Sequence, residues 1–400
     1  MARRTHVRIP LARRLPPIGE QFVSVEALGG VVLLAATVAA LVWANVGGGA
    51  SYTDLWSTGL TLGFGDLAIT EDLRHWVNDG LMAVFFFVVG LEIKRELIEG
   101  DLRDPKTAAL PVMAALGGMV LPAALFLAIN PSAPGSEGWG IPVATDIAFA
   151  IGVLSVLGSR IPKGLKLFLL TLAIVDDIGA ILVIAVFYSS GLSGPWLGGA
   201  VATLLVFFLF QRTGIRHPVA YVVPALVLWV CTLESGVHAT IAGVILGLLA
   251  PNQDWRGQPV IGRIERLLHP WTSFLVIPVF ALANAGVELG GGVIGDALSS
   301  RITLGIMAGL VLGKTLGISA AVAAAVRLRL GRLPAGVRPR QIVGAGAVAG
   351  IGFTVSLFIA DLSFGGTPLL ADAKVGILLA SLTSGVLGVL LLLRPARAPR

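Results

Sequence analysis

Long apolar stretches alternate with short polar segments along almost the whole chain. A helix needs ~20 mostly apolar residues to cross a bilayer, and twelve stretches approach this length, although some are short or contain glycine and proline. The pattern predicts an all-α polytopic membrane protein, a single transmembrane domain over residues 1–400. Its helices are expected at about 24–46, 76–98, 107–130, 138–158, 164–189, 196–211, 218–233, 236–250, 267–287, 302–326, 341–360 and 374–393.

Lysine and arginine lie almost entirely in alternate segments between these predicted helices. Those segments and the two chain ends hold 25 of the 29 basic residues. The opposite loops contain only Arg74, Arg301 and Lys374. Because basic loops remain in the cytoplasm, residues 1–20 and 394–400 are expected to be cytoplasmic tails.

The composition supports a lipid environment and excludes several other classes of protein. Hydrophobic residues make up 56% and charged residues 13% of the chain, against roughly 45–50% and 25% in soluble proteins. The mean hydropathy is +0.88. This composition excludes a disordered chain, and the single cysteine excludes a disulfide scaffold. The net charge of +6 does not indicate nucleic-acid binding, because the arginines lie in short loops between apolar helices. The expected surroundings are membrane lipid.

Four charged residues lie near the middle of predicted helices. Asp146 follows Thr145 in the fourth helix, Asp176 and Asp177 are adjacent in the fifth, and Lys314 lies midway along the tenth. A charge at the bilayer centre costs at least about 2.5–3.5 kcal/mol, so such residues usually mark an ion or proton pathway. Structural ion pairs are the alternative explanation. A further aspartate, Asp79, lies near a helix end, where an interfacial position is sufficient to explain it.

The adjacent aspartates indicate different roles for the two side chains. Neighbours on a helix point in different directions, so we expect one to face a water-filled cavity and the other to face Lys314 or a proton. Carboxylate oxygens suit hard cations and also titrate. A site that holds either protons or a cation is the site of an exchanger.

Two of the predicted helices are interrupted near their middle. Pro142 breaks the fourth just before Thr145, and the eleventh contains GAGAVAGIGFTVS, beginning at Gly344. Unwound backbone in a membrane occurs where it lines a cavity or is buried in protein. The fourth and eleventh helices run in opposite directions, so helices 3–5 and 10–12 are predicted to form inverted repeats. Close packing of small residues is the alternative for the glycines.

Several segments resemble the bacterial Na+/H+ antiporter A family. They are LMAVFFFVVGLEIKREL, ATDIAFAIGVL, LAIVDDIGAI, SGVHATIAGVI, GKTLGIS and GIGFTVSLFIA, and the resemblance runs from about residue 20 to 390. Inverted repeats with interrupted helices are known from several transporter families, this one among them. The resemblance implies an electrogenic Na+ (or Li+)/H+ antiporter of the bacterial inner membrane that uses the proton gradient to export sodium by alternating access. It implies no cofactor.

The resemblance also assigns roles to the buried charges. Asp177 is implied to be the principal Na+ ligand and proton carrier, Asp176 its neighbour at the ion, and Lys314 a salt-bridge partner or proton carrier. Thr145 and Asp146 are implied to lie where the interrupted helices cross. There Asp146 is expected to offset the positive helix ends and Lys314 the negative ones. Whether two aspartates, or one aspartate and Lys314, carry the protons stays open.

Regulation by cytoplasmic pH is a further implication of the resemblance. Charged clusters at a funnel mouth can sense pH and steer cations, although ordinary solvated loops and a packed histidine are alternatives. Gly262, Arg266 and Thr315 depart from the familiar family residues, so the pH threshold and the geometry near Lys314 are open. The matching pH-response residues are Glu92, Arg95, Glu96, His238, Arg263 and Glu265.

Residues 51–71 are too polar to cross a membrane. Alternating residues around GFGD predict a β-hairpin, with a plain loop as the alternative. The resemblance implies a periplasmic hairpin that joins two copies of the chain into a homodimer.

Other functions fit the sequence less well. The segment GLVLGKT from Gly309 is nearly a phosphate-binding loop, but it has one residue too few between its glycines and lies in an apolar helix, so ATP binding is not expected. No enzyme motif surrounds the buried aspartates. A symporter for organic acids would need a free cationic pocket, and a scaffold would need no titratable residues at the membrane centre.

Overall fold

The computed structural model describes residues 18–47, 49–63, 68–189, 191–215, 217–251, 254–255, 258–290 and 293–393. Both predicted tails, apart from residues 18–20, and most of the GFGD segment lie outside these residues.

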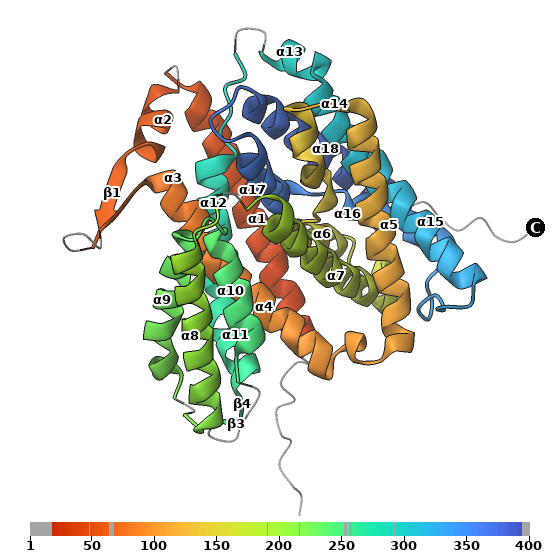
Figure 1. The fold of residues 1–400 in the computed structure, drawn as a ribbon. Helices are drawn as coiled ribbons and strands as arrows, with labels where there is room; N and C mark the ends of the chain where they lie inside the picture. The colour runs from red at the N-terminus through yellow and green to blue at the C-terminus, as the bar shows by residue number, and fades with distance from the viewer. Residues whose placement is uncertain are drawn as a thin grey trace, which may run out of the picture.

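The described chain is almost entirely helical (Figure 1). Three short helices, η2, η7 and η8, are π-helical, and η3–η6 are 3-10 helices. The elements, in chain order, are α1 (Ile18–Asn45), α2 (Ala50–Trp56), β1 (Gly59–Leu62), β2 (Ile69–Asp72), α3 (Leu73–His75), η2 (Trp76–Leu81), α4 (Met82–Glu99), η3 (Asp101–Arg103), α5 (Pro105–Ile129), η4 (Gly135–Val143), α6 (Ile147–Val156), η5 (Gly158–Arg160), α7 (Lys163–Phe187), α8 (Gly194–Arg212), η6 (Pro218–Tyr221), α9 (Val222–Leu233), α10 (Ala239–Leu249), β3 (Asp254–Trp255), β4 (Gln258–Pro259), α11 (Val260–Trp271), η7 (Thr272–Val276), α12 (Ile277–Asn284), α13 (Val293–Ser299), α14 (Arg301–Met307), η8 (Ala308–Gly313), α15 (Lys314–Arg327), α16 (Pro339–Ala349), α17 (Phe353–Phe364) and α18 (Leu369–Leu393).

Nine of the twelve predicted spans are long and apolar enough to cross a membrane, within the described part of the chain. Seven are continuous, and two are bent pairs, η4 with α6 and α16 with α17. The other three predicted spans are also helical. They are η2 with α4, which carries a charged end, and the short apolar helices α9 and α10. The chain is a polytopic helical membrane protein, as predicted.

The helices form two bundles, which Figure 1 shows side by side. The first bundle contains α1–α4 and α8–α12, with α4 packed along α10. The second contains α5–α7 and α13–α18, with α5 packed along α15. Glycines permit both close pairings, because a Cβ on Gly247 would collide with α4 and one on Gly317 would collide with α5. Small residues at helix contacts are typical of membrane bundles.

Both predicted inverted repeats lie in the second bundle. Each consists of a long helix, a broken helix and another long helix: α5, η4–α6 and α7, then α14–α15, α16–α17 and α18. The bends are 43° and 46°. The half-helix before the first break contains Pro142 and is a 3-10 helix, so the α-helix expected there is wrong for this half. Proline removes a backbone donor and disrupts the α-helical ladder.

The predicted hairpin is present but shorter than expected. Strands β1 and β2 pair antiparallel, with Leu60 opposite Glu71, and they lie outside the helical body in Figure 1. The first residues of the predicted segment form α2 instead. The Trp76 indole donates to Leu60 O at 2.9 Å, which ties the hairpin to η2.

The molecule has two opposite sides, the hairpin side and the basic side. The hairpin side carries α13, at the top of Figure 1, and α2 and the β-hairpin, at its upper left and left. The basic side is the opposite one, where α4 ends and where α16 begins after Arg338.

Candidate functional site

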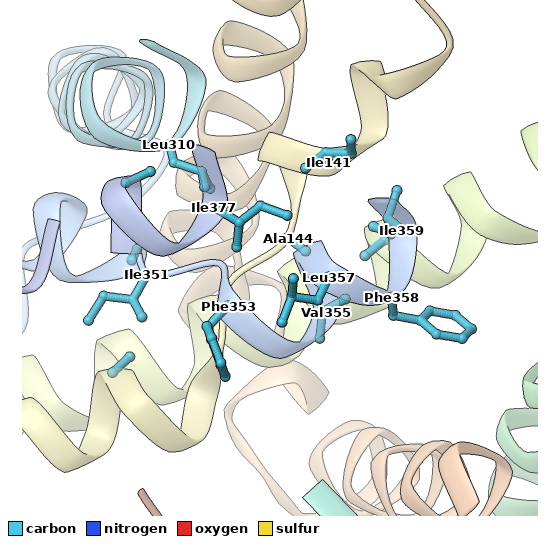
Figure 2. Close-up of a cluster of buried hydrophobic side chains, with 14 of the residues drawn as sticks. Ile141, Ala144, Leu310, Ile351, Phe353, Val355, Leu357, Phe358, Ile359 and Ile377 are labelled. Carbon is cyan, nitrogen blue, oxygen red and sulfur yellow. The ribbon is translucent and has the colours of Figure 1, made fainter. Parts of the chain in front are cut away.

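The two broken helices meet at their breaks, at the centre of the second bundle. Thr145 Oγ1 donates to Ala349 O at 2.8 Å, and Asp146 N donates to Ile351 O at 2.6 Å. Each unwound segment therefore satisfies polar backbone groups of the other, which lipid cannot do. Figure 2 shows Ala144 and Phe353 among the apolar side chains packed around this crossing. The crossing that the resemblance implied for Thr145 and Asp146 is confirmed.

Asp146 joins the positive ends of two half-helices. Its Oδ1 accepts from Phe149 N at 3.0 Å, in the first turn of α6. Its Oδ2 accepts from Thr354 N at 3.0 Å and from Thr354 Oγ1 at 2.7 Å, in the first turn of α17. A carboxylate at a helix N-terminus is stabilised by the helix dipole and by unpaired N–H groups. The structure places Asp146 at these positive helix ends, where both of its carboxylate oxygens accept hydrogen bonds.

Asp176 and Lys314 form a buried ion pair. Lys314 Nζ contacts Asp176 Oδ2, and both side chains are fully buried. Lys314 therefore contacts a carboxylate from α7, as the salt bridge implied for it requires. Thr315, the departure beside it, lies in regular helix and donates to Val311 O at 2.6 Å.

Asp177 faces a cavity between the two bundles, away from Lys314. The cavity is also lined by Thr145 and Asp146 at the crossing and by Glu92 and His269 from the first bundle. Within the described residues, Asp177 Oδ1 has no hydrogen-bond partner. The prediction that one aspartate faces a cavity and the other faces Lys314 is confirmed. The reason is that adjacent helical residues point about 100° apart.

The cavity extends toward the basic side, where part of the expected pH-response group lies. Arg95 and Glu265 form an ion pair there, one helical turn beyond Glu92 and His269 respectively. The Glu265 side chain is 4% exposed. The Glu265 carboxylate of this ion pair is therefore buried, one helical turn from a residue that lines the cavity.

The other expected pH-response residues lie elsewhere. Glu96 accepts from Asp101 N at 2.8 Å and closes the turn after α4. Arg263 lines a separate apolar groove, beside α9 and α10. His238 precedes α10 on the hairpin side, where Nε2 lies 2.8 Å from Tyr188 O. The structure therefore brings together Glu92, Arg95 and Glu265, but not the whole group.

Sequence reasoning did not identify two residues of this site. Thr354 holds Asp146 from the second broken helix, and His269 lines the cavity. Thr354 lies in the GIGFTVS segment, directly after the break, where a hydroxyl can cap the new helix. No sequence pattern indicated that His269 lines the cavity. It stands beside Pro270 near the end of an amphipathic helix.

The chemistry of this arrangement suits a hard cation or a proton. The cavity offers carboxylate and hydroxyl oxygens, which hard cations prefer. No group of three or more His, Cys, Asp or Glu that could hold a metal ion occurs among the described residues.

Comparison with known proteins matches this arrangement to one transporter family. The family model described as Na+/H+ antiporter 1 matches residues 20–392. The Na+/H+ antiporter NhaA 2 of Sorangium cellulosum is 46% identical, over 95% of this chain and 91% of its own length. The Na+/H+ antiporter NhaA of Escherichia coli is 48% identical, over 92% of this chain and 96% of its own. The chain belongs to the Na+/H+ antiporter 1 family, whose members are transporters rather than enzymes.

Proposed function

We propose that this protein is a Na+/H+ antiporter in which Asp177 binds the cation and the proton alternately. The observation that carries the proposal is the orientation of Asp177, which presents an oxygen without a partner to the cavity between the bundles. The names of the relatives support sodium and protons as the transported ions. Lithium is a further substrate in this proposal, because it is also a hard monovalent cation.

The function is tested by proton movement in everted membrane vesicles. Respiration acidifies the lumen, and a fluorescent dye follows its pH after Na+, Li+ or K+ is added between pH 6.5 and 8.5. Na+ and Li+ are expected to collapse the gradient, whereas K+ is not. No response to any of these cations would refute the proposed function.

The transport cycle follows from the position of the site. In this proposal the basic side faces the cytoplasm of a bacterial inner membrane, because basic segments remain there. Protons from the periplasm protonate the site. The site then opens to the cytoplasm and releases the protons there. Na+ binds Asp177 next, with Asp176 nearby. A rocking motion of one bundle against the other carries the ion outward.

The buried ion pair gives the cycle a second titratable unit. Asp177 takes one proton, and the pair of Asp176 and Lys314 takes another. More protons than cations then cross per cycle, so exchange is electrogenic. In proteoliposomes, an imposed membrane potential is expected to change the exchange rate. A rate independent of the potential would refute this part of the proposal.

Regulation by cytoplasmic pH is assigned to the charges beside the cavity. Replacing Glu265 by glutamine keeps its shape and removes its negative charge. The neighbouring groups, among them His269 and Glu92, then hold protons less tightly. The pH of half-maximal exchange is expected to fall, by on the order of one unit. An unchanged pH profile would argue against a sensor here, and the matched control is Glu99→Gln at the exposed end of α4.

The hairpin is proposed to join two copies of the chain. It lies outside the helical body (Figure 1), as a dimer contact requires. Replacing residues 59–71 by a short glycine–serine linker is expected to convert a dimer to a monomer, as measured by light scattering in detergent. The matched control is Thr61→Ala with Thr70→Ala, which removes the 2.9 Å hydroxyl contact between the strands but keeps them. A dimer that persists without the hairpin would refute the assignment.

A further inference from the structure

On the hairpin side, a partly buried hydrogen bond joins the two bundles. Asn78 of η2 and Asn284 of α12 belong to the first bundle, and Asp361 of α17 belongs to the second. Asn78 Nδ2 donates to Asp361 Oδ2 at 2.8 Å. Asn284 Nδ2 donates to Asn78 Oδ1 at 2.8 Å and to Phe280 O at 3.0 Å. The Asn78 side chain is therefore also hydrogen-bonded to its own bundle.

An aromatic layer lies beneath this hydrogen bond, nearer the ion site, on α12, α17 and α4, the last of which continues from η2. Phe86, Phe280 and Phe358 come from α4, α12 and α17 and are almost completely buried. The ring centroid of Phe358 is 5.7 Å from that of Phe86 and 6.3 Å from that of Phe280. In Figure 2, Phe358 projects away from the crossing. The Asn78–Asp361 hydrogen bond and the aromatic layer therefore both lie between the hairpin side and the ion site.

The two sides of the molecule differ in how the bundles contact each other. On the basic side of the crossing, a cavity lined by residues of both bundles reaches Asp177, although α1 also packs against α6. On the hairpin side the bundles are joined by the Asn78–Asp361 hydrogen bond, and again where His238 lies 2.8 Å from Tyr188 O. For ions to reach Asp177 from the hairpin side, the bundles must separate there, and the Asn78–Asp361 bond must break.

We propose that the Asn78–Asp361 hydrogen bond is the outer latch of this transporter. It holds the hairpin side shut while the ion site is open to the basic side, and its release permits the outward-open state. The proposal rests on the alternating access of the proposed function.

Other charged groups interact electrostatically with Asp361. Lys374 of α18 lies deep in the second bundle and interacts electrostatically with Asp361. Asp79 of η2 and His238 before α10 also interact with Asp361 at longer range. A carboxylate that accepts a buried amide hydrogen bond makes a stronger contact than a neutral acceptor does. The latch is therefore expected to bias the two states by about tenfold.

The test is the accessibility of a single cysteine placed on the far side of the latch. Val355 lines the cavity beside Asp177, so Val355→Cys is introduced together with Cys231→Ser. A membrane-impermeant maleimide is applied from each side of the membrane. With the latch intact, we expect labelling from the basic side and little labelling from the hairpin side.

Two variants remove the latch from opposite bundles. Asp361→Leu and Asn78→Leu are each expected to raise the rate of labelling from the hairpin side about tenfold. Together they should raise it no further than either does alone, because both remove the same bond. The matched control is Ser363→Ala on the same helix, whose hydroxyl donates within α17 to Ile359 O at 2.7 Å. It should leave labelling unchanged.

Each outcome of this experiment decides the proposal. If neither Asp361→Leu nor Asn78→Leu changes the labelling, or if their effects multiply independently, the latch is refuted. If one variant does not fold, the other still provides the comparison. Labelling requires no transport, so a protein that fails to exchange Na+ would refute the proposed function without deciding the latch.

Discussion

Exchange of Na+ for H+ is expected to fall by roughly 100-fold or more when Asp177 is replaced by asparagine. The amide has nearly the same shape, but it has no charge for the cation and no site for the proton. The aspartate presents a buried oxygen to the cavity without a hydrogen-bond partner among the described residues, so no neighbouring group can replace it. The loss should therefore appear at every pH, not as a shift of the pH profile.

The measurement is the dye-based assay in everted vesicles, at matched amounts of protein in the membrane. Asp54→Asn is the matched control, because Asp54 is exposed in α2 on the hairpin side. It should exchange like the parent protein. An Asp177→Asn variant that still exchanges Na+ for H+ would place the ion elsewhere and refute the assigned site.

Replacing Lys314 by methionine is expected to destabilise the folded protein by about 3–5 kcal/mol. Methionine fills much of the same volume, but it leaves the carboxylate of Asp176 buried without its counter-charge. Both side chains are fully buried. The free energy of unfolding in detergent should therefore fall steeply, with a matching drop in the melting temperature.

The double variant Lys314→Met with Asp176→Leu distinguishes the effect of an unpaired buried charge from the effect of altered packing. Replacing both buried charges by apolar side chains removes the unpaired carboxylate, so most of the lost stability should return. Exchange by this variant should no longer depend on the membrane potential, because the second titratable unit is absent and Asp177 alone exchanges one proton for one cation. A Lys314→Met protein as stable as its parent would show that the pair contributes little to the fold.

Much of the architecture was predictable from sequence because lipid imposes strict rules on a chain. A membrane span must satisfy its own backbone and be apolar, so its length and composition are visible in the residues. The short helices α9 and α10 could be located in this way, with ends within a few residues of those predicted. The 3-10 form of η4 was not predicted, since Pro142 marks a break but does not determine which helix precedes it.

The sequence indicated which residues form the site, but not which of their side chains contact one another. Asp177, Asp176 and Lys314 stood out because charges are rare inside apolar helices. The helical period also required the two aspartates to point apart. Which of them met Lys314 was not predictable from spacing, because it depends on how α7 lies against α15.

The sequence by itself determined that this chain is a helical membrane protein with titratable groups in its interior and two interrupted helices. These are local properties, set by the cost of burying charges and unpaired backbone groups in lipid. Only the tertiary structure decided that Asp146 joins two helix ends, that Asp177 faces the cavity, and that Asn78 meets Asp361 across the bundles. Those contacts join residues far apart in the chain, and their geometry depends on how whole helices pack, which no local pattern encodes.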